Sequence, residues 1–119
     1  MKIQDDLTKY ISSALNNALP EKTKIKTRFH LLDAIVSILT GRLLPPGQKG
    51  FNFSKNQGGL EEATLLGNNI KVSAINAAFS NGMAAHANET DDSHTKGRFH
   101  PGCAIIPTTL AIAEKENLS

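Results

Sequence analysis

The stretch IKTRFHLLDAIVSILTGRL, residues 25–43, carries the strongest folding signal in the chain. One apolar stripe follows alternating steps of four and three residues through Ile25, Phe29, Leu32, Val36, Leu39 and Leu43. A second stripe lies beside it at Leu31, Ile35 and Ile38. This spacing matches the helical period of about 3.6 residues. Because apolar residues occupy more than one face, we predict a long helix in the middle of a bundle.

The segments on either side of this helix have different characters. Before it, apolar residues at helical spacing predict a helix over residues 5–18, and Pro20 marks its end. This first stripe consists of Leu7, Ile11, Ala14, Leu15 and Ala18. After it, residues 45–59 are rich in glycine and hold two prolines, which is typical of a loop with at most a short helix. Residues 63–66 and 70–72 flank a Gly-Asn-Asn turn and predict a short hairpin.

Two further helices are expected in the second half of the chain. Ser73 is a suitable N-cap for a helix through about Ala87. Its many alanine, serine and glycine residues allow another backbone to approach closely, so this helix needs tight surroundings. A last helix is expected over residues 104–117, with Pro107 in an early turn or at a kink. The fold class is therefore all-α, a multihelical bundle with at most a minor hairpin.

Composition limits the class of protein. A chain of 119 residues fits one domain, and 13 Lys and Arg against 11 Asp and Glu give a charge of only +2. Nothing in this balance calls for nucleic acid or an anionic membrane. The single cysteine, Cys103, excludes an internal disulfide and an iron–sulfur cluster, and it fits a reducing, cytoplasmic setting. No apolar run approaches the roughly 18 residues of a membrane span, so we expect no membrane partner.

The polar run at residues 88–102 brings acids, hydroxyls, imidazoles and cations together between two apolar helices. If the preceding helix continues for one more turn, His86, Glu89 and Ser93 share a face, with Asp92 beside Glu89. His100 would return to them from the loop. A histidine with a pKa near 6.5 can take or give a proton at neutral pH, and a carboxylate beside it can fix its orientation.

Other interpretations of this run remain open. Lys96 and Arg98 could pair with a carboxylate substrate, whereas the simplest alternative is a solvated connecting loop. A metal site is a third interpretation, and its candidate ligands are His86, Asp91, Asp92, His94 and His100. Their spacing matches neither a zinc helix nor a calcium loop, so we predict no metal. Ser93 beside His94 does not form a nucleophile site. His30 is interpreted as a packed or solvent-edge histidine, and Cys103 as a packing residue.

The ordered motifs across this region resemble the signature of the MmgE/PrpD family. The resemblance lies in residues 81–94, NGMAAHANETDDSH, followed by HPGCA at 100–104 and PTTLA at 107–111. LLDA at 31–34 and EATLLG at 62–67 also resemble the N-terminal region of that family. The family includes 2-methylcitrate dehydratase, cis-aconitate decarboxylase and iminodisuccinate epimerase.

The resemblance implies a lyase that removes or moves a proton next to a carboxylate of a small di- or tricarboxylate. It also implies chemistry without a metal or cofactor. His100 corresponds to the histidine of the His-Pro motif and is the expected proton donor or acceptor. Glu89 stands where many members have Asp, and Ser93 where many have Thr. Asp91 and Asp92 match an Asp-Asp pair that orients other groups.

The resemblance also raises a question of length, because family members are several times longer. We therefore interpret residues 1–119 as one partial helical domain, the N-terminal piece of a larger fold: a truncated gene product, a split subunit or a cloned fragment. Its catalytic residues would be His100, Asp92, Asp91, Glu89 and Ser93, and its substrate-binding residues His86, Lys96 and Arg98. A homo-oligomer or a complementing chain is the expected partner. The alternative is a catalytically silent helical subunit that binds a partner chain or itself.

Overall fold

The computed structural model describes residues 2–14 and 16–118, and within them the chain is mainly helical. In chain order the elements are α1 (Lys2–Ala14), α2 (Glu21–Gly41), α3 (Pro45–Gln57), β1 (Ala63–Leu65), β2 (Ile70–Val72), α4 (Ala74–His86) and α5 (Gly102–Lys115). The all-α prediction with a minor hairpin is confirmed. Among the described residues, no helix has the length and apolar character needed to cross a membrane.

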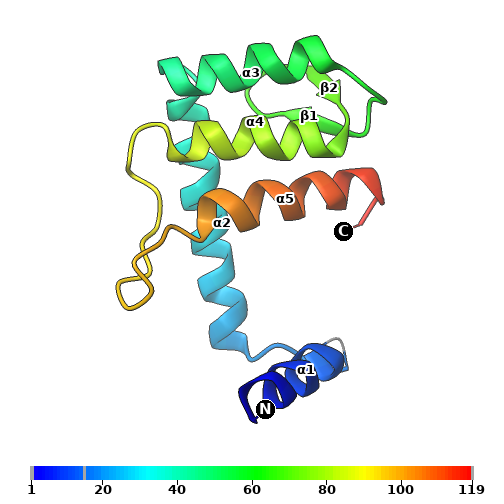
Figure 1. Cartoon of the computed structure of the whole chain (residues 1–119), viewed down its shortest axis with the longest axis vertical. Coiled ribbons are helices and arrows are strands. Elements are labelled where there is room, and N and C mark those ends of the chain that lie inside the picture. Colours follow the sequence, from blue (N-terminus) through cyan, green and yellow to red (C-terminus); the bar gives the residue numbers. More distant parts are fainter. Residues whose placement is uncertain (1, 15, 119) are drawn as a thin grey trace.

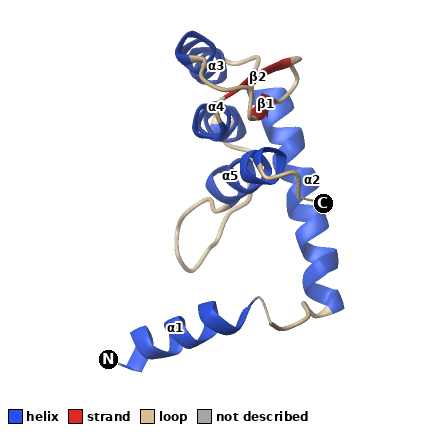
Figure 2. Cartoon of the chain, turned by 90° about the vertical axis from the view of Figure 1, so that its right-hand side faces the viewer, coloured by secondary structure: helices blue, strands red, loops and turns tan. Residues whose placement is uncertain are grey.

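Helix α4 lies between α3 and α5, and α2 crosses the three of them (Figures 1 and 2). Small side chains make this close packing possible, because the buried residues of α4 are Ala74, Ala77, Ser80, Asn81, Ala84 and Ala85. A Cβ on Gly41 of α2 would lie only 1.9 Å from the carbonyl oxygen of Ala84. Ser73 caps the helix by accepting a hydrogen bond from the backbone N–H of Asn76, as predicted.

The prediction that residues 45–59 form a loop with a possible short helix is wrong in its main part, because nearly the whole segment forms helix α3. Pro45 and Pro46 occupy the first turn, where a helix needs no N–H donor from them. Gly47 is buried, and a Cβ there would lie 2.3 Å from the carbonyl oxygen of Gly41. The glycine that suggested a loop therefore serves close helix packing.

The two strands of the hairpin pair antiparallel with Ala63 opposite Val72 and Leu65 opposite Ile70. Buried Asn81 of α4 fixes the hairpin, since its side chain accepts from the N–H of Leu66 and donates to the carbonyl of Thr64. The apolar core combines hairpin residues with α4 and α5 through Ala63, Leu65, Val72, Ala74, Ala77 and Ala111.

The prediction that α2 lies in the middle of a bundle is wrong within the described residues. Its packed face holds the buried residues Ala34, Ser37, Ile38 and Gly41, of which only Ile38 belongs to the second stripe. The first stripe is exposed, with Phe29 at 67% and Leu32 at 60% of their full accessibility. Only one face of α2 meets α4, so the other remains on the surface of the described chain.

The first helix differs from its predicted bounds. It ends at Ala14 rather than near residue 18, and none of its residues is buried. Leu15, part of the predicted stripe, lies outside the described residues. Figure 2 shows α1 apart from the other helices, at the far end of α2.

Candidate active site

The loop between α4 and α5 spans residues 87–101 and holds most of the predicted site residues. Helix α4 ends at His86, with Ala87 as its C-cap. Glu89 adopts a positive φ of 55°, which no α-helix allows. The conditional prediction of one further turn, with His86, Glu89 and Ser93 on a common face, is therefore wrong. The loop instead folds back so that its aspartates meet both helices.

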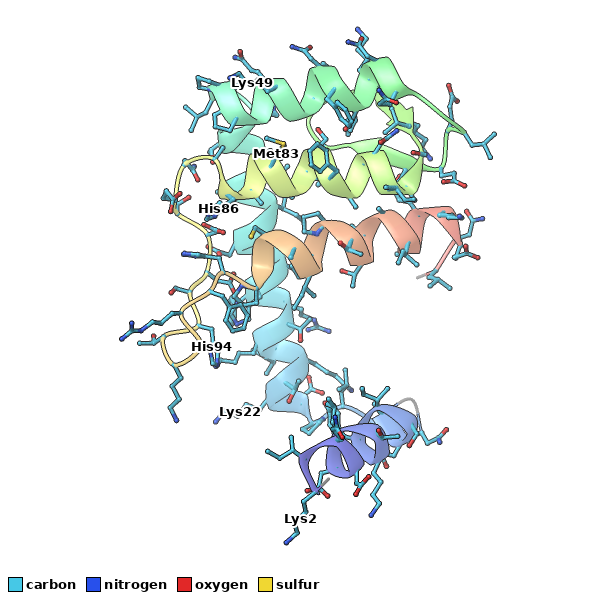
Figure 3. The ribbon with its side chains drawn as sticks, in the orientation of Figure 1. Lys2, Lys22, Lys49, Met83, His86 and His94 are labelled. Atoms are coloured by element: carbon cyan, nitrogen blue, oxygen red, sulfur yellow. The ribbon has the colours of Figure 1, made fainter. Side chains whose placement is uncertain are left out.

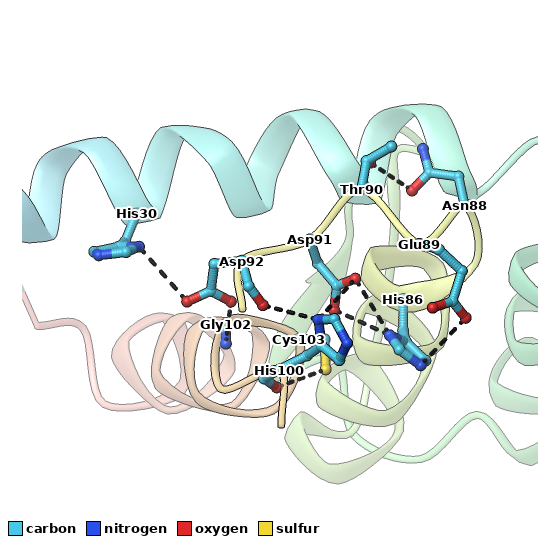
Figure 4. Close-up of polar contacts among 10 residues, drawn as sticks. All are labelled: His30, His86, Asn88, Glu89, Thr90, Asp91, Asp92, His100, Gly102 and Cys103. Carbon is cyan, nitrogen blue, oxygen red and sulfur yellow. Dashed lines mark hydrogen bonds and ion pairs between the residues drawn. The ribbon is translucent and has the colours of Figure 1, made fainter. Parts of the chain in front are cut away.

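Asp91 joins two histidines that come from different elements (Figure 4). Its side chain is only 2% exposed. One carboxylate oxygen lies 3.0 Å from Nδ1 of His86, and the other lies 3.6 Å from Nδ1 of His100. The centroids of the two imidazole rings are 5.2 Å apart. We call His86, Asp91 and His100 the two-histidine cluster.

A backbone carbonyl determines the tautomer of His100. Its Nδ1 lies 2.9 Å from the carbonyl oxygen of Asp92, and a carbonyl oxygen can only accept a hydrogen bond. Nδ1 of His100 must therefore carry the proton, which leaves Nε2 of the neutral ring with a free lone pair. At 34% exposure, the ring remains accessible to a small molecule. The arrangement gives His100 the features of a general base.

Asp92, although adjacent to Asp91, contacts a different set of groups. One of its oxygens accepts a hydrogen bond of 2.7 Å from the N–H of Gly102, in the first turn of α5. Negative charge at this helix end is favoured by the helix dipole. The other oxygen lies 3.6 Å from Nδ1 of His30 on α2. Asp92 thus ties the loop to α2 and α5.

His30 is the residue that sequence reasoning missed, because it was interpreted as a packing or solvent-edge histidine. Its ring is about half exposed and extends from α2 to the carboxylate of Asp92. No local motif marks this contact, since the two residues are far apart in the sequence. The only available signal was a polar ring in an otherwise apolar part of α2.

The remaining predicted residues lie on the outer part of the loop. Glu89 is exposed, with its carboxylate 3.6 Å from Nε2 of His86. Ser93, Lys96 and Arg98 are all exposed, and the structure does not bring them to the two-histidine cluster. His94 accepts a hydrogen bond from the N–H of Gly97. Figure 3 shows His94 in the lower part of the loop, away from His86 at the end of α4.

The electrostatics of the cluster favour a charged His86. The hydrogen bond to Asp91 raises the pKa of His86 above its usual value of 6.5, and this effect outweighs the partial desolvation of the ring. Cys103, whose Sγ donates to the carbonyl of His100, has a raised pKa because burial disfavours the thiolate. The thiol therefore stays protonated at neutral pH and packs, as predicted for it.

Some of the candidate metal ligands lie close together in the cluster. His86, Asp91 and Cys103 offer ligand atoms within 4.8 Å of one another, so two of the five candidates lie in this group. A metal needs a neutral imidazole and a thiolate. The raised pKa values of both His86 and Cys103 oppose those states. At neutral pH a metal would therefore have to displace a proton from each of these two groups.

Two surface hollows lie in this region, one beside His86 of the cluster and one beside Asp92. One, of about 420 Å³, is lined by His86, Cys103 and mostly apolar residues of α4 and α5. The other, of about 280 Å³, is lined by His30, Asp92 and the first turns of α5. The first is large enough for a small organic acid, since small-molecule sites begin at about 300 Å³.

Comparison with known proteins gives one result. A family model described as the MmgE/PrpD N-terminal domain matches residues 5–119. The searches of curated proteins and of solved structures return no match.

Proposed function

Because the chain belongs to the MmgE/PrpD family, whose members are lyases, we propose that the two-histidine cluster provides acid/base catalysis in such a lyase. The proposed reaction is of the 2-methylcitrate dehydratase type, the elimination of water from a small di- or tricarboxylate. The observation that carries the proposal is buried Asp91 between His86 and His100. A solvated connecting loop would have no reason to bury a carboxylate between two imidazoles.

His100 is the proposed acid/base. Its free Nε2 takes the proton from the carbon next to a substrate carboxylate, and the electron pair of that C–H bond forms the new C=C bond. The C–O bond to the hydroxyl group breaks at the same time. The leaving hydroxyl receives the proton from the His100 imidazolium, so water is released and His100 returns to its neutral form. Asp92 acts as a positioning residue, because its carbonyl holds Nδ1 of His100.

His86 is the proposed carboxylate-binding residue. Its raised pKa favours the imidazolium, which pairs with Asp91 through Nδ1. Its Nε2–H lies 3.6 Å from the exposed Glu89 carboxylate, and a substrate carboxylate would take the place of Glu89 there. Ser93, Lys96 and Arg98 are proposed to bind hydroxyl and carboxylate groups of the substrate from the outer loop.

The test is absorbance-monitored turnover of 2-methylcitrate, with cis-aconitate as the decarboxylation alternative. In the active enzyme that contains this chain, His100→Ala should lower the rate by roughly 10² to 10⁴, the usual contribution of general acid/base catalysis. The control is His94→Ala, which removes an exposed histidine of the same loop and should leave the rate nearly unchanged.

A binding measurement on the chain itself complements the kinetics. Citrate should shift the imidazole resonances of His86 and His100 in a saturable manner, and His94 should not respond. Near-normal turnover in His100→Ala would remove His100 from its role. Absence of turnover together with unshifted imidazoles would contradict the proposed site as a whole.

A second candidate function is binding of a partner chain, either another copy or a complementing chain that completes a larger helical domain. The specific observation in its favour is the exposed apolar stripe of α2. This stripe consists of Ile25, Phe29, Leu32, Val36, Leu39 and, just past the end of the helix, Leu43. An exposed apolar stripe along one helix face marks interaction sites in soluble proteins.

Light scattering at increasing concentration tests whether the partner is a second copy. The wild-type chain should give a mass above 12.8 kDa, and Leu32→Glu should return it to that monomer value. Thr23→Glu is the matched control, since it adds the same charge at an exposed position of the same helix outside the apolar stripe. A wild-type monomer at millimolar concentration would rule out self-association.

A further inference from the structure

A surface hollow of about 300 Å³ lies at the end of α2, where it meets α3 and the hairpin turn. It is lined by Arg42, Leu43, Gln48, Phe51, Asn52 and Asn68. The polar side chains of this set are one guanidinium and three amides, all of which carry N–H donors. No carboxylate is among them. The hollow therefore combines positive charge with hydrogen-bond donors and lacks a negative partner.

Arg42 is the least satisfied polar residue of the described chain. Its Nε atom is buried and has no hydrogen-bond partner among the described residues. None of the ion pairs between described residues involves Arg42. A buried donor without an acceptor destabilises a fold by roughly 1–3 kcal/mol. Arg42 as a whole is only partly buried, so a ligand in the hollow would meet the part of the side chain that lines it rather than this buried atom.

The position of Arg42 at a helix end does not explain this orphaned atom. Arg42 is the C-cap of α2, where a positive charge is favoured by the helix dipole. That effect accounts for a cation at this position, and its backbone N–H bonds to the carbonyl of Ile38. It supplies no acceptor for the buried Nε. A lysine at this position would satisfy the dipole without burying a donor.

The hairpin turn is shaped to accommodate the guanidinium. Gly67 has a φ of +78°, and a Cβ there would lie 2.5 Å from Nε and 3.0 Å from Cζ of Arg42. Any larger residue at Gly67 would therefore displace the head group. The missing side chain keeps Arg42 against the turn, next to Asn68 in the wall of the hollow. The guanidinium therefore packs against the turn at Gly67.

We propose that this hollow, which we call the Arg42 site, binds a small oxyanion through the Arg42 guanidinium and the amides of Asn52 and Asn68. The planar, forked guanidinium of arginine can donate two parallel hydrogen bonds to the oxygens of a carboxylate or phosphate group. Such charge-assisted hydrogen bonds are stronger than those between neutral groups. Gln48 already donates to the carbonyl of Leu43, so Asn52 and Asn68 are the available amides. A volume near the lower end of small-molecule sites favours a small acid over a nucleotide.

The Arg42 site goes beyond the proposed lyase function. Its lining shares no residue with the hollow beside His86 or with the hollow beside Asp92. Loss of lyase activity would therefore not contradict anion binding at the Arg42 site. Absence of anion binding at the Arg42 site would likewise not contradict the lyase function. The two proposals are tested independently.

The experiment follows the Nε–Hε resonance of Arg42 by NMR during titration of the wild-type chain with citrate and, separately, with inorganic phosphate. Sodium chloride at matched ionic strength is the reference. A saturable shift of this resonance and of the Asn68 amide is expected with at least one of the two anions. The citrate arm identifies carboxylate recognition, and the phosphate arm identifies phosphate recognition.

Variants locate the binding. Arg42→Gln should raise the Kd for the anion by about tenfold or more, the loss of affinity expected for one charge-assisted hydrogen bond. Arg28→Gln removes the same charge from an exposed position of the same helix and should bind like wild type. Arg42→Lys keeps the charge and removes the fork, and it should also bind more weakly. It serves as the folded comparison if Arg42→Gln does not fold.

Three results would overturn the proposal. The first is no saturable shift with either anion at tens of millimolar. The second is an equal shift with sodium chloride, which would show simple screening. The third is undiminished binding in a folded Arg42 variant, or equal weakening in Arg28→Gln.

Discussion

Helix α4 and the loop that follows it are positioned by different forces. Helix α4 is surrounded by α2, α3 and α5, and its buried side chains are mostly alanines, so its place depends on shape and close contact. The loop over residues 87–101 buries few apolar groups and is held by two consecutive aspartates that contact three helices. Volume changes should therefore disrupt the helix, whereas charge changes should disrupt the loop.

The largest expected effect comes from adding volume to the helix packing. Gly41→Ala places a methyl group 1.9 Å from the carbonyl oxygen of Ala84, and a backbone atom cannot rotate away. Overpacking of this kind costs roughly 1–3 kcal/mol, and we expect the free energy of unfolding to fall by about 3 kcal/mol because the backbone must move. Chemical denaturation measures it.

The control for this substitution is Asn56→Ala on the exposed side of α3. It introduces the same residue into a helix without a close neighbour and should change stability by less than about 1 kcal/mol. If Gly41→Ala were as stable as this control, the close approach of α2 and α4 would not determine the fold.

A smaller effect is expected when the loop loses one of its aspartates. Asp92→Ala leaves the buried N–H of Gly102 without its acceptor and removes the contact to His30, so stability should fall by about 2 kcal/mol. Asp33→Ala removes the same charge from an exposed position of α2 and should change stability by less than about 0.5 kcal/mol. Equal denaturation midpoints for the two variants would contradict the tie between loop and helices.

The same contrast explains how much of the fold could be predicted. The periodic segments α2, α4 and α5 were found because apolar spacing and an N-cap are local signals. Helix α3 was missed because its glycines and prolines resemble a loop locally, and only the contact between Gly47 and Gly41 gives them a helical role. The buried stripe of α2 was misassigned for a similar reason, since sequence spacing does not reveal which face meets another helix.

The candidate site was predicted in composition but not in geometry. Local sequence placed Asp91, Asp92 and His100 in one polar run with His86 just before it, and the structure brings all four together. Local sequence could not show that the two consecutive aspartates contact different partners, because those contacts depend on the turn at Glu89 with its positive φ. Residues such as Ser93 were included through an assumed helical turn that does not form.

The smallest expected effect is electrostatic and concerns His86. Its hydrogen bond to Asp91 raises its pKa above 6.5, so protonation favours the folded state. This contribution is full below about pH 6.5, the value in the unfolded chain, and is lost as pH rises through the raised folded value. Because the His86 side chain is 46% exposed, solvent reduces the contribution to overall stability.

The most direct test of the two-histidine cluster is an NMR titration of the His86 imidazole in the wild-type chain and in Asp91→Asn. Asp91→Asn removes the charge of the carboxylate while nearly preserving its shape. We predict a wild-type pKa above 6.5 that falls toward 6.5 in the variant. A wild-type pKa at or below 6.5, or the same pKa in both proteins, would show that Asp91 does not charge His86 and would contradict the role of His86 as a charged carboxylate-binding residue of the cluster.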